Sequence, residues 1–165
     1  TLEPKSITMS SKFKWMIMGS MLVVLLFIFL LPQKKIVIDS ESGEEIYLPP
    51  ETFEIHWIHS IEKEEWFEVY DIEDEGFILT ESHFKTFGAG VPSDSDKPAE
   101  VTEDGFVKYT INDPYPDIYM NVSDNVETKI VQGDDEILLY ELYEPYTAVE
   151  ITIEYIALIK QFIGG

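Results

Sequence analysis

Three residues that could support catalysis stand together in the sequence, at His59, Ser60 and Glu62. A hydroxyl, an imidazole and a carboxylate form the set used in hydrolysis, where serine attacks and histidine takes its proton. Residues 53–59, however, alternate between apolar and polar side chains as a β-strand does, and neighbouring side chains on a strand point to opposite faces. We therefore predict no catalytic residue here. Two interpretations of His59 stay open: a core-edge histidine bonded to a carboxylate or carbonyl, and a residue that contacts a ligand.

A glycine-rich segment with the sequence GAGVP, at residues 88–92, is the second candidate. Gly88 and Gly90 can adopt positive φ, so the backbone around Ala89 can turn its N–H groups toward a carboxylate or phosphate. A dinucleotide-binding fingerprint would need a third glycine and a following helix, and both are missing. The alternative interpretation is a structural turn at the end of a strand.

The chain has many acidic residues, but their spacing gives little support for a metal site. The segment from Asp71 to Gly76 resembles the start of a calcium-binding loop, but its third and fifth positions are Glu. Its twelfth position is Ser82, where such a loop needs a bidentate Glu, and it lies between strands. We therefore predict a hairpin turn with solvated carboxylates, no metal site and no cofactor. Weak cation binding is expected at most in the acidic segments 94–96 and 134–136.

The elements that must position these residues are strands. Apolar and polar residues alternate with period two through most of the chain after residue 35, as in half-buried strands. The predicted strands are 36–38, 45–48, 53–59, 67–72, 77–84, 106–111, 118–122, 128–131, 137–143 and 149–160. Short strands separated by Gly-containing turns predict an all-β fold, either an antiparallel β-sandwich or a partly closed barrel. The longest predicted loop is 88–102.

A hydrophobic segment precedes the strands. The 17 residues from Trp15 to Leu31 carry no charge. As a helix they would span about 25 Å, close to the roughly 30 Å hydrocarbon core of a membrane. A retained signal anchor and a cleaved signal peptide are the competing interpretations. We favour the anchor, a single N-terminal transmembrane helix, because the run exceeds a signal-peptide core and no small-residue cleavage pattern follows it.

The predicted organisation is a cytoplasmic tail at residues 1–12, a transmembrane anchor at 13–33 and an extracytoplasmic β-domain at 34–165. Three Lys precede the apolar run and two follow it. The positive-inside rule then places the N-terminus in the cytoplasm and the β-domain outside.

Composition excludes several classes of function. The chain has no Cys, which rules out disulfides, a zinc–thiolate site and a thiol nucleophile. Beyond residue 35, six Lys face 31 Asp and Glu, a net charge of −25. Such a surface repels nucleic acid and anionic lipid headgroups, and it favours cations or basic protein surfaces as partners.

Two segments carry a resemblance to a known family. The first is HSIE at 59–62 with EWFE at 65–68, and the second is FKTFGAGVP at 84–92. Together they resemble an uncharacterised bacterial family of short proteins that have one N-terminal hydrophobic segment. Its members are encoded beside TRAP transporters of the TAXI type, so the resemblance implies an auxiliary role near a solute transporter and no activity. The candidate ligand- or partner-binding residues that it carries over are His59, Ser60, Glu62, Gly88, Ala89, Gly90 and Pro92.

We therefore expect a membrane-anchored, extracytoplasmic accessory or binding subunit of a TAXI-type TRAP uptake system. Its partners would be the permease, the solute-binding protein or both. If the two segments meet at one rim of the sandwich, backbone amides would supply hydrogen-bond donors there and His59 a switchable charge. The alternative is a free-standing cell-surface β-domain that binds cations or proteins through its acidic face. An enzyme is least favoured, because no nucleophile, base and orienting group converge.

Overall fold

The computed structural model describes residues 10–41, 45–85 and 99–160 of the chain. They fall into two compact units, which are described separately here. One unit comprises residues 1–33 and 155–165, and the other comprises residues 34–154.

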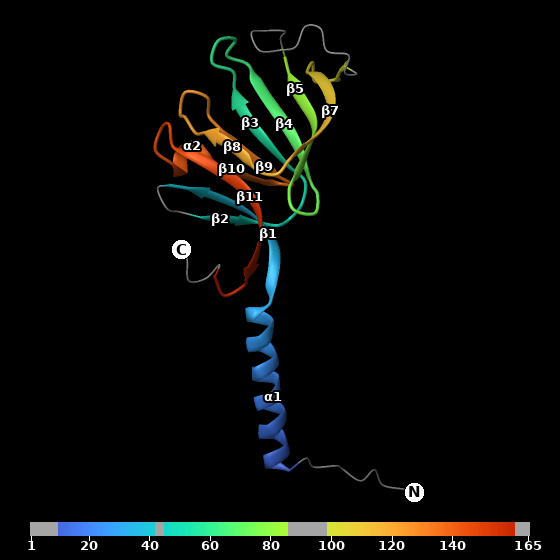
Figure 1. Cartoon of the computed structure of the whole chain (residues 1–165), viewed down its shortest axis with the longest axis vertical. Coiled ribbons are helices and arrows are strands. Elements are labelled where there is room, and N and C mark those ends of the chain that lie inside the picture. The colour runs from blue at the N-terminus through green and yellow to red at the C-terminus, as the bar shows by residue number, and fades with distance from the viewer. Residues whose placement is uncertain (1–9, 42–44, 86–98, 161–165) are drawn as a thin grey trace, which may run out of the picture. The chain divides into compact units, whose positions relative to one another are not determined.

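The N-terminal element is a long apolar helix, α1, which spans Ser11–Leu30 (Figure 1). None of its 20 residues is buried. A helix that is apolar all round and unburied is typical of a membrane span, and this one is long and apolar enough to cross a membrane. A signal sequence shares these features. The predicted boundaries of tail, anchor and domain stay predictions.

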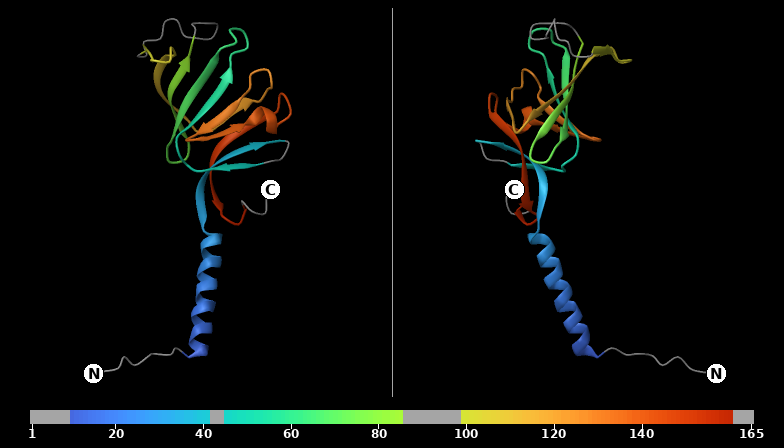
Figure 2. Two further views of the ribbon diagram at one scale, coloured as in Figure 1. Left: turned by 180° about the vertical axis from the view of Figure 1, so that it is seen from behind. Right: turned by 45° about the vertical axis from the view of Figure 1, so that its right-hand side comes forward.

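In the described residues, eleven strands form two antiparallel sheets, and the predicted all-β sandwich is confirmed (Figures 1 and 2). The four-stranded sheet has the order β2 (Ile46–Leu48), β1 (Pro32–Ser40), β11 (Ala148–Ala157) and β8 (Ile118–Asn121). The seven-stranded sheet has the order β10 (Asp135–Leu138), β9 (Lys129–Gln132), β3 (Phe53–Ile58), β4 (Glu65–Ile72), β5 (Phe77–Phe84), β7 (Val107–Tyr115) and β6 (Ala99–Val101).

One hydrophobic core joins the two sheets. Phe53, Phe77 and Ile130 enter it from the seven-stranded sheet, while Ile36 and Ile151 enter it from the four-stranded sheet. Each is at most 1% exposed. Burial of one such side chain contributes about 1.5–3 kcal/mol, so this core can hold the sandwich together without disulfides.

Bulges in β5 and β7 change which side chains of β5 face the core. Phe77 and Phe84 are both buried, although strict alternation over seven positions would place them on opposite faces. The β5–β7 register shifts between Leu79 and Glu81, and Asn112 in β7 has a φ of 60° near that shift. The extra residue reverses the alternation, so both ends of β5 contribute to the core.

Three sequence-based expectations are wrong in detail. Residues 137–143 are not one strand: β10 ends at Leu138, and a short helix, α2 (Leu139–Leu142), follows. Leu139 and Tyr143 are both buried, which one helical turn achieves as well as a strand. The predicted loop 88–102 includes a strand, β6, in its described part. In the predicted strand 149–160, Tyr155 was expected to share the covered face of Val149 and Ile151, but it is 63% exposed in β11.

Candidate functional site

The first predicted segment forms the tight turn between β3 and β4, residues 59–64, which we call the rim turn. Strand β3 ends at Ile58, one residue earlier than predicted. The His59 N–H donates to the Glu64 carbonyl over 2.8 Å, and the Lys63 N–H donates to the His59 carbonyl over 2.9 Å. Lys63 has a φ of 58°, which closes the turn. The turn therefore brings His59, Ser60 and Glu62 into one short loop.

The His59 ring faces Glu62 rather than Ser60. Its Nδ1 contacts the Glu62 carboxylate, and its ring stacks on Trp66 with centroids 5.0 Å apart. Both charged side chains are mostly buried, whereas Ser60 is exposed. The expected core-edge histidine bonded to a carboxylate is the arrangement found, and the ligand-contacting role of His59 stays a prediction.

Two buried polar atoms near the rim turn lack a partner. Within the described ranges, Trp66 Nε1 and Glu64 Oε2 are buried and form no hydrogen bond. An unsatisfied buried donor or acceptor costs about 1–3 kcal/mol, so each such atom calls for an explanation. Beside them, Ile61 is 71% exposed at the turn.

The second predicted segment lies outside the described residues. This applies to Gly88, Ala89, Gly90 and Pro92, and also to the acidic segment 94–96. The strand leading toward it is described as far as Phe84, which is the register partner of Trp66. Described β5 therefore ends at the same edge of the sheet as the rim turn, as expected. Whether the two segments meet stays a prediction.

The calcium-loop-like segment is a hairpin turn between β4 and β5, as predicted. The Glu73 N–H donates to the Gly76 carbonyl over 3.0 Å, and Asp71 Oδ1 accepts a hydrogen bond from Thr52 over 2.6 Å. Gly133, with a φ of 61°, forms the turn between β9 and β10 beside Asp134. Among the described residues, no three His, Asp or Glu side chains are arranged to hold a metal ion.

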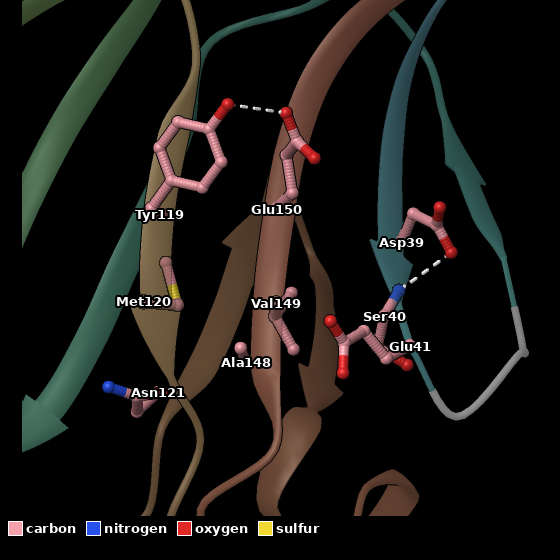
Figure 3. A pocket seen from close by; sticks show the side chains of 9 residues that line it. All are labelled: Asp39, Ser40, Glu41, Tyr119, Met120, Asn121, Ala148, Val149 and Glu150. Atoms are coloured by element: carbon pink, nitrogen blue, oxygen red, sulfur yellow. Dashed lines mark hydrogen bonds between the residues drawn. The ribbon is translucent and has the colours of Figure 1, made fainter.

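A cavity of about 410 Å³ lies over β1, β11 and β8 (Figure 3). Its polar side chains take part in two separate hydrogen bonds. Tyr119 donates to Glu150 over 2.7 Å, and Asp39 accepts from the Ser40 N–H over 2.7 Å. Figure 3 shows Tyr119 and Glu150 on two neighbouring strands and the Asp39–Ser40 pair on a third. No convergent polar group marks this cavity as a specific site.

A second cavity, of about 280 Å³, lies between the two sheets, and we call it the Glu68 cavity. Strands β3 and β4 supply one wall, and β8 with the segment after it supplies the other. Its lining residues are Ile55, Trp57, Glu68, Tyr70, Ile118, Tyr119, Met120, Asn121, Val126 and Thr128. Glu68 is the only charged side chain among them.

The Glu68 carboxyl is placed in the cavity by strand parity. Trp66, Glu68 and Tyr70 share one face of β4, and Tyr70 and Ile55 beside them are buried. The Tyr70 hydroxyl donates a hydrogen bond to Glu68 Oε2 over 2.7 Å. Burial raises the pKa of Glu68 above its ordinary value, and the hydrogen bond from Tyr70 opposes that shift only in part.

The opposite face of the seven-stranded sheet carries a row of side chains that crosses six strands. In register, the row is Lys129, His56, Phe67, His83, Lys108 and Glu100. Phe67 stacks between the two imidazoles, with centroids 4.7 Å from His56 and 4.2 Å from His83. Carboxylates flank both rings: Glu54 and Glu65 contact His56, and Glu81 contacts His83.

His56 is a titratable residue of this row that is hydrogen-bonded to two carboxylates. It bonds Glu54 over 2.6 Å and Glu65 over 3.1 Å. Burial acts to lower its pKa, but the hydrogen bonds with these two carboxylates outweigh burial and raise it above 6.5. Lys129, opposite His56 on β9, is paired with Glu136 over 3.0 Å.

A histidine whose pKa is higher in the folded state binds its proton more tightly there. Its contribution to stability is therefore complete below about pH 6.5 and is lost as the pH rises through the folded-state value. His56→Gln should accordingly show a shallower fall in unfolding free energy across that range than the wild type. Denaturant titrations at several pH values measure this slope. An unchanged slope in His56→Gln would contradict the assignment, and Glu65→Gln should weaken the slope in part.

Sequence reasoning missed Glu68, His56 and His83. A signal for each was present. Glu54 and His56, and again Glu81 and His83, are two residues apart in a predicted strand, which places a carboxylate and an imidazole on one face. Glu68 stands between Trp66 and Tyr70 at the same spacing, so a charged residue falls on an apolar face.

These features define a β-sandwich domain of two unequal antiparallel sheets, preceded by an apolar helix and containing an acidic cavity between its sheets. A domain of unknown function, DUF1850, matches residues 53–139, more than half of the 165 residues. The chain therefore belongs to the DUF1850 family. The match covers the rim turn and all the lining residues of the Glu68 cavity, but it carries no activity and no link to a transporter. No curated protein and no solved structure matches the chain.

Proposed function

We propose that the chain is a membrane-anchored, extracytoplasmic accessory or binding subunit associated with a TAXI-type TRAP solute uptake transporter. Its partners are the permease, the solute-binding protein or both. The resemblance carried by residues 59–62 and 84–92 supports the transporter association. A long apolar helix, α1, whose residues 15–30 carry no charge, supports the anchor.

The proposed topology places the N-terminus in the cytoplasm. Lys12 and Lys14 lie in the first turn of α1, whereas Lys34 and Lys35 follow the helix in β1. Together with Lys5, the N-terminal side carries the larger positive charge, which the positive-inside rule retains in the cytoplasm. A retained anchor would keep the β-domain at the membrane surface, within reach of a permease.

The rim turn is the proposed contact surface, and the exposed Ile61 is the observation that carries the proposal. Ile61 is a large apolar side chain, and it is 71% exposed at the turn. A partner seated on the turn would cover this side chain. Interface hot spots are typically such aromatic or aliphatic anchors surrounded by polar groups.

The test is recovery of the transporter with the full-length chain. The tagged chain is co-expressed with the TRAP permease and solute-binding protein of its own organism and is purified in mild detergent. Ile61→Asp should reduce recovery of the transporter subunits about tenfold, as expected for the loss of a hot spot worth more than about 1 kcal/mol. Leu142→Asp is the matched control, because Leu142 is a large apolar side chain that is 52% exposed in another element, α2.

Equal recovery with both variants would count against the rim turn as the contact surface. Failure to recover any transporter subunit with the wild-type chain would count against the association itself. That second result would favour the alternative proposal, a free-standing cell-surface β-domain that binds cations or proteins through its acidic face. The domain's net charge of −25 supports that alternative.

A further inference from the structure

We propose that the Glu68 cavity is a binding site for a small organic cation, namely an amine carried on an apolar body, with the Glu68 carboxylate as its counter-ion. The proposal does not depend on the association with a transporter. It rests on the shape of the cavity, the chemistry of its walls and the position of its single charge.

The cavity is suited to a small amphipathic molecule. Its volume of about 280 Å³ is just below the range typical of sites for drug-sized ligands, so a smaller molecule fits. Ile55, Tyr70, Ile118 and Thr128 are buried and form its floor, while Tyr119 is exposed and lies at the mouth. A mostly apolar pocket with one well-placed polar group is the usual form of a small-molecule site.

Glu68 lacks a cation in the described part of the protein. Its hydrogen bond comes from the neutral Tyr70 hydroxyl, and no Lys lines the cavity. The pKa of Glu68 is raised by burial, and no positive charge acts to lower it. A bound ammonium group would supply both the missing charge and a charge-assisted hydrogen bond.

Other ligand classes fit these walls less well. An organic anion would meet the Glu68 charge inside a domain whose net charge is already −25. Calcium needs six to eight oxygen ligands, and this cavity offers a single carboxylate among apolar side chains. Trp57 and Tyr70 present aromatic rings, which attract organic cations as well as apolar groups.

A purely structural role for Glu68 predicts a different result. Because burial raises its pKa, the folded protein disfavours the ionised carboxylate at neutral pH. The contribution of Glu68 to stability is most favourable below about pH 4.5 and falls as the pH rises through the folded-state value. Glu68→Gln keeps an oxygen that can accept from Tyr70 and removes this penalty. The Glu68→Gln variant should therefore have a higher unfolding free energy than the wild type at pH 7. If the Glu68 carboxylate instead stabilised the fold, the variant would be less stable than the wild type.

Binding can be followed at a single reporter inside the cavity. Met120 lines both this cavity and the 410 Å³ cavity, and it is the only Met after residue 21, so the Glu68→Gln variant is needed to assign a shift to this cavity. The full-length chain, labelled at its Met methyl groups and held in zwitterionic lipid nanodiscs, is titrated at pH 7 with benzylamine, benzyl alcohol and benzoate. Benzylamine is protonated at this pH, as a Lys side chain is. Met120→Leu assigns the reporter signal.

Benzylamine should shift the Met120 signal in a saturable manner, with an affinity at least about tenfold higher than that of benzyl alcohol, as expected for one hydrogen bond to a charged group. Benzoate should bind most weakly. In Glu68→Gln, the advantage of benzylamine over benzyl alcohol should disappear. Glu75→Gln, which removes an exposed charge from the β4–β5 turn, is the matched control and should retain it.

Three results would overturn the proposal. One is equal affinity of the wild type for benzylamine and benzyl alcohol, and another is the absence of any saturable shift at Met120. The third is an equal loss of affinity in Glu68→Gln and Glu75→Gln, which would indicate general attraction of cations to an acidic surface. Should Glu68→Gln fail to fold, the comparison of the three probes on the wild type still decides.

Discussion

Phe53→Ala is expected to lower the free energy of unfolding of the β-domain by about 3–5 kcal/mol, the range for truncating a buried Phe. Phe53 is 1% exposed and lies in the core shared by the two sheets. Its ring stacks on Tyr70 with centroids 5.5 Å apart and meets Phe77 edge-on at 5.6 Å. The substitution would therefore remove two aromatic contacts and leave a cavity that strand backbones cannot close.

Chemical denaturation followed by tryptophan fluorescence measures this loss, with Trp57 and Trp66 as reporters in the domain. Domains of this size have a total stability of about 5–15 kcal/mol, so the variant should unfold at a much lower denaturant concentration. Val101→Ala is the control, because Val101 is 74% exposed in β6 and its truncation should cost little. A loss below about 1 kcal/mol in Phe53→Ala would show that this core does not hold the sheets together.

Gly76→Ala should destabilise the domain by about 1–3 kcal/mol, the usual cost of forcing an extra methyl group into a packed site. A Cβ at Gly76 would lie 2.7 Å from the Tyr115 carbonyl oxygen and 3.2 Å from the Pro116 Cα. Both neighbours are backbone atoms at the end of β7, so relief requires movement of a strand rather than rotation of a side chain.

The matched control for this variant is Glu75→Ala, which changes the preceding, exposed position of the same turn. Thermal unfolding of both variants against the wild type measures the difference. A melting temperature for Gly76→Ala equal to that of Glu75→Ala would contradict the close approach of β7 to this turn. Gly105→Ala makes a further comparison, because Gly105 has open space around it and a φ of 84°, so any cost there is conformational.

Much of the fold follows from local pattern. The apolar run at 15–31 predicted α1, and nine of the ten predicted strands overlap an observed strand for most of their length. Turns at Gly76 and Gly133 join neighbouring strand pairs, β4–β5 and β9–β10, as the pattern implied. Hairpins are predictable because the alternating pattern and the turn residues both act over a few neighbouring positions.

Features that depend on distant contacts were not predictable. The register shift near Thr80 reverses the alternation along β5, and it is defined by the pairing of β5 with both β4 and β7. Residues 139–142 form a helix, and Leu139 and Tyr143 are buried. The sequence pattern alone does not distinguish this helix from a strand, because either element would bury both residues. Neither the register shift nor the helix at 139–142 can be predicted from a short stretch of sequence.

The candidate site also has one part that the sequence predicts and other parts that only the tertiary structure shows. Proximity of His59, Ser60 and Glu62 is a local matter, since they occupy one turn, and the sequence was enough to place them together. The Glu68 cavity requires β4 of one sheet to face β8 of the other, and these strands are about fifty residues apart in the chain. The cross-strand row needs the register of six strands.

By itself, the sequence determined an apolar helix, an acidic domain of short antiparallel strands and the turn that carries His59. Each of these depends on composition or on the spacing of near neighbours. Only the tertiary structure decided that Glu68 lies in a cavity between the sheets and that Phe67 separates two imidazoles. The physical reason is that side-chain burial depends on which strands pair and in which register, and these choices are made by the packed core as a whole.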